Sequence, residues 1–241
     1  MSSPHSAAPH SADLPAPSAE SARLAATADS AVAATEAATA AATAAADAAT
    51  DAIVVQDMVR WLERAVIGLN LCPFAKGVHT KGQIHYAVSA ATDGRELLQD
   101  LQRELEALAE ASPEKRDTTL LIAPRCMEDF LDFNDFLELA DEMLDVLDLG
   151  GILQIASFHP QFQFDGTEVD DITNATNRAP YPTLHLIREE SLDAAVEAFP
   201  EAEMIYERNM EVLRELGAAG WQALDVGARC PHHPKPTEEG A

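Results

Sequence analysis

The sequence predicts a mixed α/β domain: a single sheet of about four largely parallel strands with crossover helices, and helical elements at both ends. Short apolar or β-prone runs alternate with amphipathic helical patterns from residue 55 to residue 216. The first three runs are separated by helices long enough for right-handed crossovers, which favours parallel neighbours in one sheet. The first 51 residues contain almost no large apolar side chain and stand outside this pattern.

The predicted domain occupies residues 52–226, between disordered tails of residues 1–51 and 227–241. The first tail is rich in Ala, Ser, Thr and Pro, and such a segment cannot bury enough surface to offset its ordering entropy. Its alanines favour transient helix. The domain itself is long enough to bury a sizeable core without disulfides or metal.

The predicted elements follow the order helix, strand, helix, strand, helix, strand, long loop, strand, helix. Three- and four-residue apolar spacing defines the helices, and short apolar or alternating runs define the strands. Their ranges are helix 55–69, strand 83–89 after a loop over 70–82, helix 93–108, strand 118–123, helix 127–147, strand 152–158, loop 159–182, strand 183–187 and a helical region 191–216, in which a break at Pro200 is left open. Asp93 and Glu96 form a capping-box pattern, and Ser191 is expected to cap the last helix. The direction of the fourth strand is open.

Composition excludes several classes of protein. The formal net charge is −25, which repels phosphate backbones and anionic membranes, so neither nucleic acid nor membrane is an expected partner. Three widely spaced cysteines (Cys72, Cys126 and Cys230) form no disulfide framework and favour a reducing compartment, with the cytoplasm as the expected location. No apolar stretch reaches the length of a membrane helix.

Ligands of open α/β sheets tend to bind outside the carboxyl ends of the strands. The loop 159–182 leaves from that edge, and a connection this long in a compact domain is usually a lid or a binding loop. Within it, Arg178 could hold a carboxylate or phosphate through two hydrogen bonds, and Asn177 and Asp171 offer further polar groups. The structural alternative is an Arg178 that pins the loop by pairing with Asp170 or Asp171.

Two histidines are candidates. His159 ends a predicted buried strand, where an imidazole could act as a base or as a ligand. A structural histidine bonded to a loop carbonyl fits the same position. His185 lies within the fourth predicted strand and is a candidate ligand-binding residue, although such a histidine is more often simply satisfied inside a core.

Cys72 is the candidate nucleophile. It lies just beyond the C-terminus of a predicted helix, and the negative end of a helix disfavours a thiolate unless Lys76 or a histidine lies nearby. Lys76 is therefore included among the candidate ligand-binding residues. The sequence contains no phosphate-binding glycine loop, no dinucleotide fingerprint and no Cys-x-x-Cys, and it points to no metal site, no particular cofactor and no particular oligomeric state.

Four stretches resemble a bacterial family catalogued only as a domain of unknown function. They read GLNLCPFA from residue 68, DFLDFNDFL from residue 129, QIASFHP from residue 154 and TNRAPYPTLHL from residue 176. They are spread along the predicted domain, within residues 55–224. The resemblance implies a bacterial, cytoplasmic protein and supplies no activity, cofactor or catalytic residue.

The leading functional hypothesis is an enzyme, a hydrolase or transferase, that acts on a small anionic metabolite at the strand-end edge. Arg178 and Asn177 would orient the ligand, His159 would move a proton, and Cys72 would be the nucleophile. One alternative is a non-catalytic ligand-binding or regulatory domain. Another is an acidic module that interacts with a basic partner protein.

Overall fold

The computed structural model describes residues 39–40, 43–198 and 204–229. The chain divides into two units, residues 1–48 and 49–241. The described residues of the first unit, 39–40 and 43–48, are helical. In the second unit, an α-helix over residues 49–61 continues directly into the π-helix η1 (Leu62–Ile67).

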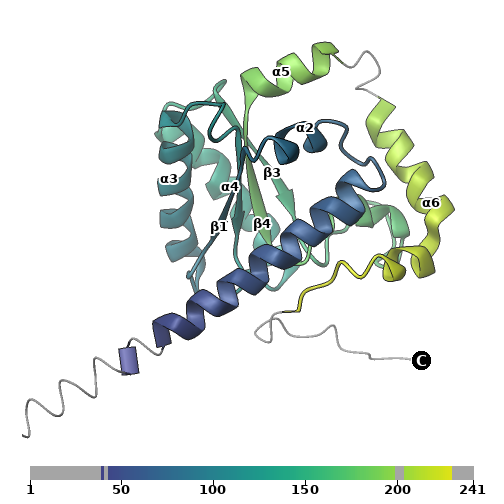
Figure 1. Cartoon of the computed structure of the whole chain (residues 1–241), viewed down its shortest axis with the longest axis horizontal. Helices are drawn as coiled ribbons and strands as arrows, with labels where there is room; N and C mark the ends of the chain where they lie inside the picture. The colour runs from purple at the N-terminus through teal and green to yellow at the C-terminus, as the bar shows by residue number, and fades with distance from the viewer. Residues whose placement is uncertain (1–38, 41–42, 199–203, 230–241) are drawn as a thin grey trace, which may run out of the picture. The chain divides into compact units, whose positions relative to one another are not determined.

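One mixed sheet organises the second unit (Figure 1). Its strands are β1 (Ile84–Val88), β2 (Thr118–Ile122), β3 (Leu153–Phe158) and β4 (Thr183–Arg188), in the order β1-β2-β4-β3. Only β1 and β2 pair in parallel, because β4 pairs antiparallel with both β2 and β3.

The prediction of a largely parallel sheet is therefore wrong. β1, β2 and β3 run in one direction, as their crossover helices require, but β4 inserts between β2 and β3. The cause is the loop 159–182, which turns the chain back at the carboxyl end of β3. Thr183 consequently lies opposite Phe158, and β4 runs back along β3.

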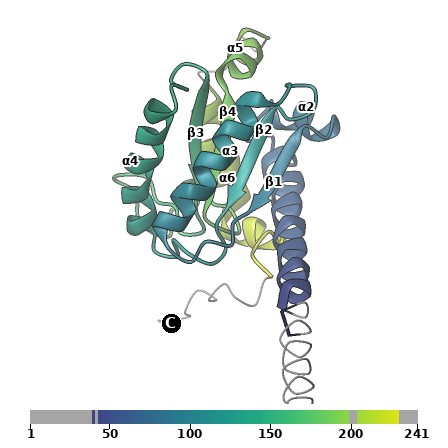
Figure 2. The ribbon, with the colours of Figure 1, turned by 90° about the vertical axis from the view of Figure 1, so that its left-hand side faces the viewer.

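Helices α3 (Gly94–Glu110) and α4 (Phe130–Val146) cover one face of the sheet (Figure 2). Each begins where an aspartate side chain accepts backbone N–H groups: Asp93 accepts from Glu96, and Asp129 accepts from Leu131 and Asp132. Their inward side chains form the larger core with alternate residues of the strands. Its members include Leu97, Leu101, Leu105, Phe133, Phe136, Ala140, Leu121, Leu184 and Leu186.

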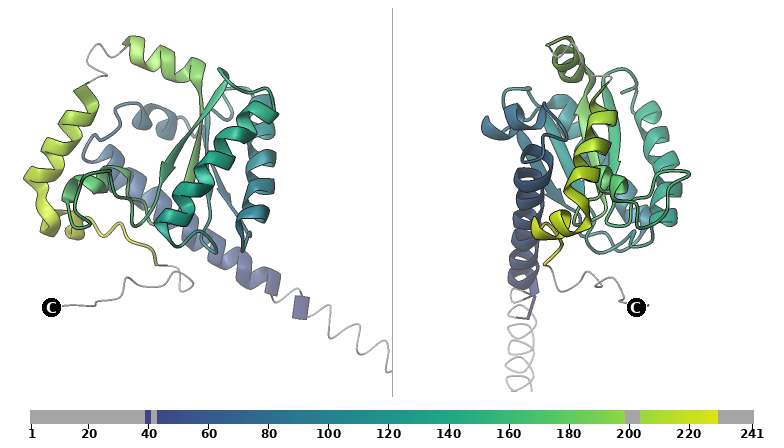
Figure 3. Two further views of the ribbon diagram at one scale, coloured as in Figure 1. Left: turned by 180° about the vertical axis from the view of Figure 1, so that it is seen from behind. Right: turned by 90° about the vertical axis from the view of Figure 1, so that its right-hand side faces the viewer.

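The helix of residues 49–67 covers the opposite face (Figure 3). It buries Val54, Met58, Trp61, Leu62 and Ala65 against Leu120, Ile122 and Tyr181. Because side chains alternate along a strand, this face also carries Tyr86 and His185, which are aligned with Leu120 in the pairing register.

The C-terminal part consists of α5 (Glu189–Ala198) and α6 (Ile205–Ala223), with a backbone kink in α6 at Gly217. α6 packs against η2 (Ile172–Asn177), a 3-10 helix inside the long connection. Leu213, Ala175 and Leu71 form a small third core there. The connection 159–182 therefore contains an element of its own.

Other predicted details differ from the structure. The predicted loop 70–82 contains the short helix α2 (Ala75–Thr80). Ser191 caps no helix, since α5 begins at Glu189 and the Ser191 hydroxyl donates to Asp117 instead. The helix predicted over residues 191–216 is two helices, and the second continues to Ala223; Pro200, where a break was considered, lies outside the described residues. The helix predicted to begin at residue 55 is already formed at residue 49. The other predicted strands and helices lie within a few residues of the observed ones.

The two tails remain predictions. Of the first tail, residues 1–38 and 41–42 lie outside the described residues, and residues 43–51 are helical. Of the second, residues 230–241 lie outside. Residues 227–229 are held on the domain, because Arg60 donates to Gly227 O and the Arg229 N–H donates to Asp57.

Candidate functional site

His159 is buried on the α3 and α4 side of the sheet, where its ring packs against Phe130 and Phe133. Its Nδ1 accepts the Gln161 N–H at 3.0 Å, so the ring proton is on Nε2, which donates to Met127 O at 2.9 Å. Both nitrogens are thus used in holding the backbone. This geometry matches the structural alternative for His159.

Asn177, Arg178 and Asp171 also hold the long connection together. Asn177 Nδ2 donates to Ser157 O, and the Arg178 guanidinium donates to Phe162 O at 3.0 Å and Val169 O at 2.7 Å. Asp171 caps η2 by accepting from Thr173, and the Thr173 hydroxyl and N–H lower the pKa of Asp171. Arg178 pins the loop through carbonyls rather than through an ion pair with Asp171.

Replacing Arg178 with alanine is expected to lower the free energy of unfolding by about 1–3 kcal/mol, because two loop carbonyls lose their donor. Local opening of the loop should increase as well. Hydrogen exchange at amides of residues 161–178 measures that opening, and Arg95→Ala on the exposed first turn of α3 is the matched control. Unchanged exchange in the Arg178 variant would contradict this structural role.

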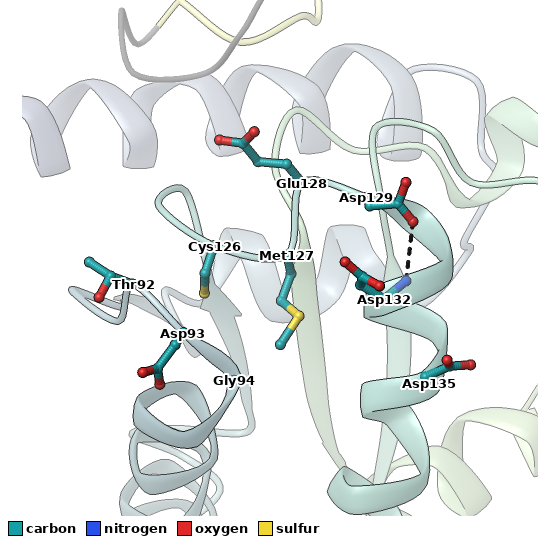
Figure 4. Close-up of a pocket in the computed structure, with 9 residues that line it drawn as sticks. All are labelled: Thr92, Asp93, Gly94, Cys126, Met127, Glu128, Asp129, Asp132 and Asp135. Atoms are coloured by element: carbon teal, nitrogen blue, oxygen red, sulfur yellow. Dashed lines mark hydrogen bonds between the residues drawn. The ribbon is translucent and has the colours of Figure 1, made fainter.

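A hollow of about 550 Å³ opens at the carboxyl ends of β1 and β2, between the N-terminal ends of α3 and α4 (Figure 4). Its lining residues are Thr92, Asp93, Gly94, Cys126, Met127, Glu128, Asp129, Asp132 and Asp135. Gly94 allows the close approach of Met127, whose Cε would lie 2.9 Å from a Cβ at residue 94. The hollow lies at the sheet edge where a ligand was expected, but none of the candidate catalytic or ligand-binding residues lines it.

The charge of this hollow opposes an anionic ligand. Five of its lining residues are carboxylates, and none is Lys or Arg. Cys126 is buried beside them, and its pKa is raised to about 11 by burial and by Asp93, Asp100 and Glu96. A small anion would be repelled here, and Cys126 stays protonated.

His185 differs from His159 in having one unused nitrogen. The Thr118 hydroxyl lies 2.6 Å from Leu186 O and 2.7 Å from His185 Nε2. Since the carbonyl can only accept, the hydroxyl proton points to it, and His185 Nε2–H donates to the Thr118 oxygen. The lone pair of Nδ1 then receives no hydrogen bond from any described residue. Burial lowers the pKa of His185 to about 4, so the imidazole is neutral.

Cys72 and Lys76 lie beside the same face of the sheet as His185, which we call the His185 face and which carries Tyr86, Leu120, Phe158 and His185. Cys72 packs against the apolar cluster of this face. Burial raises the pKa of its thiol, while the N–H groups of Phe74 and Ala75 oppose that rise. Lys76 is exposed on α2 and forms no ion pair with a described residue.

Sequence reasoning missed two residues here: Tyr86 on the His185 face, and Asp57 on the helix that covers this face. The Tyr86 hydroxyl is buried, has no hydrogen-bond partner among the described residues, and has a pKa raised to about 12 by burial and by Glu63. Asp57 is 1% exposed and pairs with Arg60. A signal was available in the sequence, because Asp57 lies three residues after Val54 and four before Trp61, which are core residues of the observed helix.

The structure divides the predicted site residues into two groups. Cys72 and His185 lie on one side of the sheet, whereas His159 packs with Phe133 on the other. Cys72 and His159, which the predicted reaction needed side by side, are therefore on opposite sides of the sheet.

Among the described residues, no cluster of three or more His, Cys, Asp or Glu side chains is arranged to hold a metal ion, and no helix could cross a membrane.

Comparison with known proteins gave one match. A family model described as "Protein of unknown function (DUF1415)" matches residues 53–223. No curated protein and no solved structure matches the chain. The family resemblance predicted from the four sequence stretches is confirmed.

Proposed function

Because the chain belongs to the family described as "Protein of unknown function (DUF1415)", we propose a function from its geometry: a hydrolase or transferase that acts on a small anionic metabolite at the His185 face. The observation that carries this proposal is the unused Nδ1 of His185. A neutral imidazole whose Nε2 proton is fixed by Thr118 offers Nδ1 as an oriented acceptor for a ligand proton.

The neighbouring segment supports an anionic ligand. The N–H groups of Phe74 and Ala75 oppose the rise in the pKa of the Cys72 thiol, and the exposed Lys76 ammonium has no ion-pair partner among the described residues. In the proposed reaction, Cys72 Sγ attacks an electrophilic carbon or phosphorus of the ligand and its proton passes to His185 Nδ1. The leaving group takes that proton, and water or an acceptor molecule then releases the product.

A thermal-shift screen of the full chain with small carboxylates and phosphorylated metabolites tests the proposal. A ligand at about 100 times its Kd should add about 2.7 kcal/mol to the free energy of unfolding. We expect a stabilising compound to lose its effect in His185→Gln and to keep it in His79→Gln, since His79 pairs with the exposed Glu63 instead. Cys72→Ser should keep binding and lose turnover.

Two outcomes would contradict the proposal. If no compound stabilises the wild type, or if one stabilises His185→Gln equally, the His185 face is not the site. If a compound binds through His185 but mass spectrometry detects no product, the non-catalytic ligand-binding alternative replaces the enzyme.

A further inference from the structure

The solvent face of α4 combines exposed apolar and acidic side chains in one stripe. Leu131, Leu139 and Val146 are 70%, 47% and 77% exposed. At 3.6 residues per turn they lie within about 80° of the helix circumference, and Asp135 and Glu142 fall inside the same arc. These five residues, Leu131, Asp135, Leu139, Glu142 and Val146, form what we call the α4 stripe, which alternates apolar and acidic groups.

The charges of α4 are uncompensated. The helix contains six carboxylates and no Lys, Arg or His, and none of the six forms an ion pair with a described residue: Asp132, Asp135, Glu138, Asp141, Glu142 and Asp145. Like charges three or four residues apart destabilise a helix, each pair by about 0.2–0.5 kcal/mol. Carboxylates in the last turn also oppose the helix dipole. A cationic partner would relieve both effects.

The stripe continues into the acidic hollow. Asp132 and Asp135 of α4 line the hollow, together with Asp129 and Glu128 just before the helix (Figure 4). One surface therefore offers an apolar ridge with a carboxylate-lined depression at its N-terminal end. That combination fits a partner with both apolar and cationic side chains.

We propose that the α4 stripe is the docking surface for a basic amphipathic helix of a partner protein. The residues of the stripe are spaced four, four, three and four positions apart, the spacing that repeats on one face of a helix. A partner helix whose facing side chains alternate between apolar residues and Lys or Arg matches this stripe in both shape and charge. A further cationic side chain beyond its end would enter the hollow.

The chain's own segments outside the described residues do not have the required charge. Residues 1–38 contain one Arg against four Asp or Glu, residues 199–203 contain two Glu and no cation, and residues 230–241 contain one Lys against two Glu. A second copy would bring the same acidic stripe and a net charge of −25. Nucleic acid and anionic membranes are repelled by the same carboxylates, which leaves a basic protein segment.

The probe is a fluorescent peptide of about 18 residues, long enough to form helix on binding. It carries Leu, Lys, Leu, Lys and Leu at the four, four, three, four spacing on a background of Ala and Gln. Fluorescence anisotropy with the full chain at physiological salt should show saturable binding. A peptide of identical composition with the five residues scattered around the helix should bind at least tenfold more weakly.

Matched protein variants test the location. The triple variant Leu131→Gln, Leu139→Gln and Val146→Gln should weaken binding at least tenfold, because it removes the apolar side chains of the stripe. All three side chains are exposed, so the variant should keep the fold. The control triple Ile53→Gln, Val169→Gln and Val196→Gln, on exposed apolar residues elsewhere, should bind as the wild type does. Asp135→Lys with Glu142→Lys should also abolish binding.

Three results would overturn the proposal. One is equal affinity of the patterned and scattered peptides. Another is wild-type affinity in the α4 triple variant. The third is a concentration-dependent dimer in sedimentation that the α4 triple variant converts to monomer, since a second copy would then be the occupant. The proposal stands independently of the His185 face, which lies on the other side of the sheet.

Discussion

Asp57→Ala is expected to lower the free energy of unfolding by about 3–5 kcal/mol, because it breaks a buried ion pair and leaves its partner uncompensated. The Asp57 carboxylate is 1% exposed and accepts from Arg60 Nη1 at 2.7 Å, the Tyr181 hydroxyl at 2.8 Å and the Arg229 N–H at 2.6 Å. Arg60 also donates to Asp225 O and Gly227 O. One carboxylate thus joins the helix 49–61, Tyr181 just before β4 and the segment after α6.

Urea unfolding followed by circular dichroism measures this change as a shift in the urea concentration at the unfolding midpoint. The m-value, the slope of the free energy of unfolding against urea concentration, should stay unchanged. Tyr181→Phe is the graded control, because it removes one of the three hydrogen bonds and should cost about 1 kcal/mol. Asp57→Asn keeps the volume and should fall between the two. If Asp57→Ala costs no more than Tyr181→Phe, the carboxylate does not stabilise the junction as its contacts indicate.

The local elements of this fold could be predicted from the sequence because their causes are local. The strand 118–123 is a short apolar run that ends at Pro124, and the apolar residues of α4 recur at three- and four-residue spacing. The neighbours of β4 could not be predicted in this way. Nothing within residues 183–188 specifies pairing with β2 and β3, since that pairing depends on where the long connection returns the chain.

The candidate site shows the same division. The position of His159 at the end of a strand was predictable, but its burial depends on the pleat of β3, which turns Phe158 to one face and His159 to the other. Arg178 was expected to find a carboxylate, yet the carbonyls of Phe162 and Val169 lie within its reach after folding. Hydrogen bonds to backbone carbonyls have no signature in residue type.

His185 gives the second large expected effect, a pH-dependent loss of stability. Its pKa is lowered by burial to about 4 in the folded protein, against about 6.5 in an unfolded chain. Between these values the unfolded state binds one more proton than the folded state. The free energy of unfolding therefore falls as the pH falls through this window, by about 3 kcal/mol in total.

The comparison of wild type with His185→Gln isolates this contribution, because carboxylates that titrate in the same window act equally on both proteins. Urea unfolding at several pH values between 7 and 4 should show the wild type losing stability more steeply than the variant. His79→Gln, on the partly exposed His79 of α2, should follow the wild-type profile. Parallel profiles for wild type and His185→Gln would mean that the imidazole is not held neutral by burial.

The same linkage sharpens the functional test. A ligand that donates a hydrogen bond to Nδ1 binds only the neutral imidazole, so its affinity should be constant above the pKa of about 4. An anionic ligand that instead favours the imidazolium raises that pKa, and its affinity must increase as the pH falls from 7 toward 5. Calorimetric titration at pH 7 and pH 5 separates these cases, and a proton taken up on binding identifies the second. In the first case His185 stays neutral in the complex and can act as the base that the proposed transfer requires, whereas in the second it is already protonated and can only pair with the anion or donate a proton.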